Sequence, residues 1–156
     1  MKKMRGVVMV EFAIVGVVLL VVIFGCLEFG RATYTLAALN EGTRRAARLA
    51  AVCPVNDTKI ALAVDFSGTA GIAGFNDTLY PGGNVKLEYL DATGTLLAVP
   101  TAGAVNYVRV GIAGYNIPLF IPGLNVTITS PTFTATLPAE SMGLSVSGPN
   151  VVSTPC

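Results

Sequence analysis

The sequence predicts an α+β protein, in which one long N-terminal helix precedes a small antiparallel β-sheet domain. Two observations favour this class. Residues 7–52 contain no proline and consist of an apolar run followed by helix-forming residues, whereas β-branched residues between turn signals dominate after Pro54. A chain of 156 residues has room for one membrane helix and one small domain. We expect a leader over residues 1–6, the long helix over 7–53 and an outward-facing β-rich domain over 54–156.

The apolar run from Val7 to Leu27 is interrupted by a single charged residue, Glu11. As a helix this run is about 31 Å long, which is enough to cross the hydrocarbon core of a bilayer. A carboxylate inside such a segment costs about 3 kcal/mol at mid-depth and less near an interface. Glu11 is therefore expected to have a partner, although a position at headgroup level would also lower this cost.

The helix is expected to continue beyond the membrane, to Val52, with Pro54 ending it. Its length would be about 69 Å, more than twice the bilayer core. Four glycines mark points where it is weakest. Apolar residues recur at steps of three or four and predict a packed face: Phe29, Ala32, Leu36, Leu39, Ala46 and Ala50.

Beyond Cys53 the pattern indicates a short helix over 59–66 and then strands. We expect a hairpin of 84–90 with 95–99, a strand over 105–115, and a strand over 125–137 that Pro131 interrupts. The tail, residues 140–156, is expected to be irregular. The helix is expected to cover one face of the sheet.

Composition argues against an enzyme. The chain has no histidine, and no pair of acids stands out, so no catalytic residue, metal site or cofactor is predicted. A net charge of +1 gives no sign of nucleic-acid binding. The region after Pro54 is poor in charge, which suits a surface that packs against other subunits.

Three cysteines are spread along the chain. Cys26 lies in the apolar run and is expected to be a small buried hydrophobic residue. In an oxidising compartment Cys53 and Cys156 are expected to form a disulfide that ties the tail to the end of the helix. Two free thiols, or a bond between chains, remain alternatives.

The N-terminus has the pattern of a processed subunit. A short basic leader ends in Gly6, four apolar residues follow, and Glu11 and Phe12 come next. This pattern resembles the type IV prepilin signal, and the resemblance implies cleavage between Gly6 and Val7. The segments VEFAIVGVVLLVVIFGCLEFGR and ALNEGTRRAARLA resemble the TadE-like minor pilins of tight-adherence (Flp-type) pili.

The resemblance implies a structural subunit that a prepilin peptidase processes and that assembles through its N-terminal helix. The new amine on Val7 would pair with Glu11 of a neighbouring subunit, since opposite charges attract strongly where water is scarce. The implied partners are other pilin subunits, the peptidase, the inner-membrane pilus assembly platform and membrane lipid. The implied location is the bacterial inner membrane, with the C-terminal domain outside, or an extracellular pilus. A role in adhesion would follow.

Glu28 and Arg31 lie where the helix is expected to leave the membrane. They either neutralise each other locally or pair with the helix of a neighbouring subunit. Basic residues flank the apolar run on both sides, so the positive-inside rule alone does not fix its orientation.

An alternative function is that of a single-pass or lipidated envelope protein, which would bind a partner through its β domain. Residues 23–26 form a weak lipobox in which Cys26 would receive the lipid. The bulky Phe24 and the uninterrupted helical pattern argue against this reading.

Overall fold

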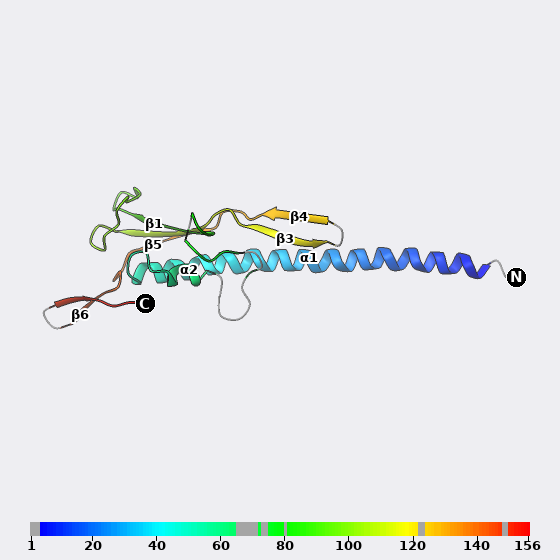
Figure 1. Cartoon of the computed structure of the whole chain (residues 1–156), viewed down its shortest axis with the longest axis horizontal. Helices are drawn as coiled ribbons and strands as arrows, with labels where there is room; N and C mark the ends of the chain where they lie inside the picture. The colour runs from blue at the N-terminus through cyan, green and yellow to red at the C-terminus, as the bar shows by residue number, and fades with distance from the viewer. Residues whose placement is uncertain (1–3, 65–71, 73–74, 80, 122–123, 148–149) are drawn as a thin grey trace.

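The computed structural model describes residues 4–64, 72, 75–79, 81–121, 124–147 and 150–156. One straight helix, α1 (Met4–Val52), runs from the N-terminus into a β-rich outer domain at the opposite end (Figure 1). The predicted α+β architecture is confirmed. The helix begins earlier than expected, within the leader, and it continues without a break through the four glycines that the sequence marked as weak points.

The two halves of α1 have different surroundings. The first half is bare, and its large apolar side chains are exposed from Val7 to Leu27. From Ala32 onward one face is buried, and Leu39, Ala46 and Ala50 lie on it as the spacing predicts. Phe29, expected on the same face, is instead exposed. Only the second half of the helix therefore belongs to the core of the folded domain.

A three-stranded antiparallel sheet covers this second half. It consists of β1 (Val85–Leu90), β2 (Tyr107–Ile112) and β5 (Thr134–Pro138), in the order β1-β2-β5. α1 packs against β2 and β5. Val108 and Val110 of the central strand are fully buried in the core beside Leu39 of the helix.

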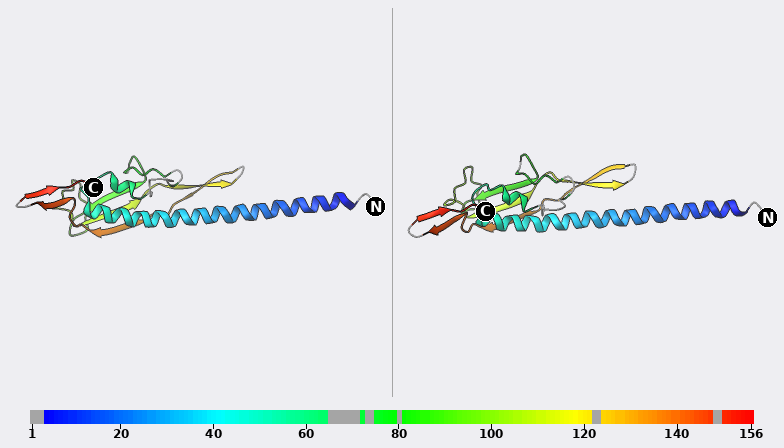
Figure 2. Two further views of the ribbon diagram at one scale, coloured as in Figure 1. Left: turned by 90° about the horizontal axis from the view of Figure 1, so that it is seen from below. Right: turned by 60° about the horizontal axis from the view of Figure 1, so that its bottom comes forward.

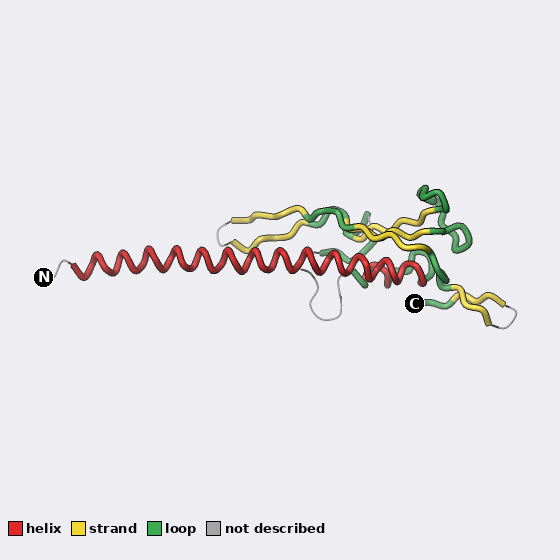
Figure 3. The backbone as a smooth tube through the Cα atoms, turned by 180° about the vertical axis from the view of Figure 1, so that it is seen from behind, coloured by secondary structure: helices red, strands yellow, loops and turns green. Residues whose placement is uncertain are grey.

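A second, two-stranded sheet extends along the helix toward the N-terminus. β3 (Asn116–Ile121) pairs with β4 (Leu124–Thr129) in an antiparallel hairpin that lies beside α1 (Figures 1 and 3). The sequence missed β3 as a separate strand. The expected strand over 125–137 is divided into β4 and β5, and the interruption predicted at Pro131 falls between them.

The expected strand over 95–99 is wrong. β1 pairs with β2 instead, through six residue pairs, and residue Leu96 forms only an isolated bridge with Leu90. A side chain explains the difference: the Asp91 carboxylate accepts hydrogen bonds from the backbone N–H groups of Thr93 and Thr95, at 2.8 and 2.9 Å. These bonds hold a tight local turn in place of an extended ladder.

The tail also differs from the expectation. It forms a third antiparallel pair, β6 (Leu144–Ser147) with β7 (Asn150–Ser153), which projects from the end of the outer domain (Figure 2). The short helix predicted over 59–66 is present as α2 (Lys59–Leu62), and residues 65 and 66 lie outside the described part of the chain.

Candidate functional site

The residues predicted to act in processing and assembly lie on the bare half of α1. Gly6 and Val7 are exposed, and a Cβ added at Gly6 would have no other atom within 4 Å. Glu11 is exposed, Phe12 is 76% exposed, and Glu11 has no hydrogen-bond or ion-pair partner among the described residues. Glu11 precedes Glu28 by about 26 Å along the helix axis. The folded domain therefore leaves this segment free for contacts outside the chain.

Glu28 and Arg31 are brought together one turn apart on α1. Their side chains form an ion pair at 2.9 Å, which is the local neutralisation that the sequence left open. The pair also contacts the hairpin, which the sequence did not suggest. The Glu28 carboxylate accepts a hydrogen bond from the backbone N–H of Phe120 at 3.1 Å, and the Arg31 guanidinium donates to the backbone carbonyl of Pro118.

The Phe120 ring completes this contact. The Arg31 guanidinium lies 4.6 Å from the ring centroid, in the geometry of a cation–π interaction. Because Pro118 has no backbone N–H, this stretch of β3 has one donor fewer to satisfy. The ion pair thus attaches the edge of β3 to the helix at the level where the apolar run ends.

Below this contact, toward the N-terminus, an apolar groove of about 600 Å³ separates α1 from the hairpin. Its helix side runs from Val17 to Ala32, and its other wall includes Leu119, Phe120 and Ile128. The charged residue in its lining is Glu28, at the upper end. The groove is therefore continuous with the surface that is expected to meet lipid.

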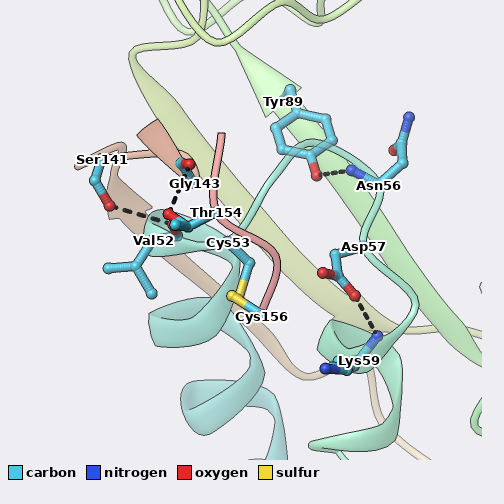
Figure 4. The surroundings of a disulfide bond; sticks show 10 residues. All are labelled: Val52, Cys53, Asn56, Asp57, Lys59, Tyr89, Ser141, Gly143, Thr154 and Cys156. Atoms are coloured by element: carbon cyan, nitrogen blue, oxygen red, sulfur yellow. Dashed lines mark hydrogen bonds between the residues drawn. A yellow bond between two sulfur atoms is a disulfide. The ribbon is translucent and has the colours of Figure 1, made fainter. Parts of the chain in front are cut away.

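The opposite end of α1 is tied to the C-terminus. Cys53 and Cys156 form a disulfide, the pairing that the sequence favoured (Figure 4). Cys26 is free and exposed rather than buried. Thr154 donates a backbone hydrogen bond to the Gly143 carbonyl at 2.7 Å, and Gly143 donates to Val52. The projecting β6–β7 hairpin is thus anchored at its base.

Two further contacts join the second half of α1, and the segment that follows it, to the outer domain. The Tyr89 hydroxyl accepts a hydrogen bond from the backbone N–H of Asn56 at 2.7 Å (Figure 4). Burial raises the pKa of Tyr89, although the hydrogen bond from Asn56 acts in the opposite direction. Gly42, buried on α1, lies against the backbone of Val64, where an added Cβ would be 2.0 Å from the carbonyl oxygen.

Comparison with known families gives one match: residues 6–48 fit the family model described as TadE-like protein. This part of α1 is therefore similar to TadE-like proteins. The match begins at the glycine of the predicted cleavage site and ends four residues before α1 does. It is consistent with a protein associated with pili. No curated protein and no solved structure matches the chain.

The matched segment contains most of the residues that the sequence singled out, including both members of the Glu28–Arg31 pair, but not the hairpin residues that this pair contacts. Pro118 and Phe120 lie about ninety residues from the Glu28–Arg31 pair, as the separations of 87 and 92 show. The apolar stretch NIPLFI, with a proline inside, was the available signal for an edge strand against an apolar helix. Among the described residues, no three His, Cys, Asp or Glu side chains lie together as a metal site would require.

Proposed function

We propose that this chain is a pilin-like structural subunit of a tight-adherence type IV pilus. It is inserted in the bacterial inner membrane, processed by a prepilin peptidase between Gly6 and Val7, and assembled with other pilin subunits through α1. It supports biogenesis of the pilus and adhesion. The observation that most supports this proposal is the family match, which begins at Gly6 and lies on an exposed helix. The mean hydropathy of that helix reaches 3.1 in its most apolar window, which suits a membrane span.

Cleavage would remove the basic leader and place a charged amine on Val7, at the start of the apolar run. The amine created on Val7 would then be available to Glu11 of a neighbouring subunit in a low-dielectric environment, where an unpaired carboxylate is penalised. Such a pair favours one register between subunits over others, because a shifted helix leaves both charges without a partner.

The N-terminus of the membrane-extracted protein tests the processing step. Mass spectrometry is expected to find Val7 as the first residue of the mature chain. A mature protein that starts at any other residue, or that keeps its leader while entering filaments, contradicts the proposal.

Substitution of Glu11 tests the assembly step. We expect Glu11→Gln to be inserted and cleaved normally but to enter filaments poorly, because the amide carries no charge. Glu140→Gln is the matched control, since Glu140 is also an exposed carboxylate but lies in the outer domain. Incorporation is measured by the amount of each variant in sheared filaments relative to the membrane fraction. Equal incorporation of both variants would show that the Glu11 carboxylate is dispensable.

The exposed thiol of Cys26 favours one second candidate, a lipidated envelope protein that never polymerises. Labelled fatty acid on Cys26 would support it. α1 runs without interruption through Gly25 and Cys26, and a lipoprotein cleaved there would lose the matched segment before Cys26.

A further inference from the structure

We propose that the β3–β4 hairpin rests in the outer boundary of the bilayer, and that phospholipid acyl chains fill the groove between this hairpin and α1. The proposal rests on the membrane insertion of α1 that the proposed function assumes. It adds a second membrane contact, made by the outer domain, to the one made by the helix.

The depth of the groove follows from the position of its helix side. The apolar run ends at Leu27, directly before the Glu28–Arg31 ion pair, which marks the outer limit of the hydrocarbon core. The groove reaches down the helix to Val17. Val17 is eleven residues before Glu28, about 16 Å along the axis, whereas half of the hydrocarbon core is about 15 Å. Most of the groove therefore lies beside the outer half of an inserted span, its upper end at Phe29 and Ala32 lies just beyond the hydrocarbon core, and the hairpin lies beside it (Figure 1).

The surface of the hairpin suits this position. The strands β3 and β4 contain no charged residue. Phe120 is 64% exposed, and Val126 and Ile128 are also exposed on the described part of the hairpin. These apolar side chains are continuous with the exposed apolar side chains of α1, so that lipid covering one surface reaches the other.

Backbone groups on the edge of the hairpin that faces α1 already have hydrogen-bond partners within the chain. On β3, the Phe120 N–H is satisfied by Glu28 and the Pro118 carbonyl by Arg31. An open sheet edge inside hydrocarbon is strongly disfavoured because its N–H and C=O groups lack partners. Asn125 and Thr127 of β4 are exposed and polar, so β4 favours contact with headgroups and water. The hairpin is therefore placed at the boundary between headgroups and acyl chains, where amphipathic elements bury an apolar face by about 5–10 Å.

The chain has no tryptophan, so a single introduced tryptophan reports its own surroundings. The full chain is reconstituted in phosphatidylcholine vesicles with or without brominated acyl chains, which quench tryptophan on contact. Phe120→Trp tests the hairpin. Leu19→Trp, exposed in the span and outside the groove lining, controls for insertion, and Val99→Trp, 80% exposed in an outer-domain loop, controls for unspecific quenching. The ratio of protein to lipid is varied from about one chain per vesicle upward.

At the lowest ratio we expect brominated lipid to reduce the fluorescence of Phe120→Trp about twofold, because its ring lies among acyl chains, and to leave Val99→Trp unchanged. Quenching of Leu19→Trp without quenching of Phe120→Trp overturns the hairpin proposal and leaves membrane insertion intact. If Leu19→Trp is not quenched either, insertion itself fails, and the proposed function fails with it. If the emission of Phe120→Trp shifts to shorter wavelength only as the ratio of protein to lipid rises, a second copy of the chain occupies the groove. That result would also overturn the proposal.

Discussion

Gly42→Ala is predicted to destabilise the outer domain, although alanine is the better helix former. A Cβ at this position would lie 2.0 Å from the carbonyl oxygen of Val64 and 2.9 Å from its carbonyl carbon, whereas ordinary contacts begin at 3.4 Å. Either the segment around Val64 or α1 must therefore move by about 1.4 Å. Both are held by the core, in which Leu39, Ile60 and Val64 are fully buried.

The magnitude follows from two opposing effects. Replacing glycine by alanine inside a helix gains about 1 kcal/mol. Overpacking a close-packed core costs about 1–3 kcal/mol, and the upper end of that range applies because the obstacle is backbone rather than a flexible side chain. We expect a net loss of about 1–2 kcal/mol. For an outer domain of this size, such a loss lowers the melting temperature by about 4–15 °C.

Gly30→Ala is the matched control. Gly30 lies on the same helix, is exposed, and has no atom within 4 Å of an added Cβ, so the substitution should be neutral or stabilising. Both variants of the full chain are melted in detergent and followed by near-ultraviolet circular dichroism, which reports the buried tyrosines of the outer domain. If Gly42→Ala melts at or above the temperature of Gly30→Ala, the close approach to Val64 does not restrict this position and the reasoning is wrong.

Two further predictions concern the end of the helix. Cys156→Ser is expected to lose about 4–5 kcal/mol of stability in the chain-entropy model, because the disulfide closes a loop with a sequence separation of 103. Thermal melting of the wild-type chain and the variant, with and without reductant, checks this. A variant that melts like the wild-type chain in oxidising buffer contradicts it. Tyr89→Phe is expected to lose about 1–2 kcal/mol, because it leaves the Asn56 N–H without its acceptor. Since burial raises the pKa of Tyr89 in the folded state, its stabilising effect is complete below the ordinary tyrosine pKa of about 10 and is lost as the pH rises through the folded-state value. Ultraviolet titration should show a late-ionising component that Tyr89→Phe removes, and a titration curve unchanged in shape would contradict this.

The long helix and its packed face could be read from the sequence because they depend on local patterns. Apolar spacing places Ala32, Leu39, Ala46 and Ala50 on one side, and the absence of proline before Pro54 gives the helix its length. The same kind of reasoning identified Gly42 only as a weak point of the helix. Its role in a close approach depends on Val64, which no local pattern connects to it.

The strand pairing was harder to predict, because pairing is a competition between distant segments. Residues 95–99 are near 84–90 in sequence, but the Asp91 turn prevents a regular hairpin, and β2 offers a longer ladder. Likewise, the tail reads as irregular by itself. It becomes a hairpin where the disulfide and the bonds of Gly143 fix its base.

The geometry of α1 also restricts where a partner of Glu11 can come from. The helix side of the groove ends at Val17, and the ion pair at Glu28, where the hairpin contacts α1, lies about 26 Å above Glu11. The described residues of the outer domain therefore place no cation near that carboxylate. Arg31 is already engaged by Glu28 and by the hairpin. In a low-dielectric environment, an anion that its own folded domain does not neutralise requires a charge from another molecule. Incorporation of Glu11→Gln tests this requirement, because a neutral amide cannot replace one half of an ion pair.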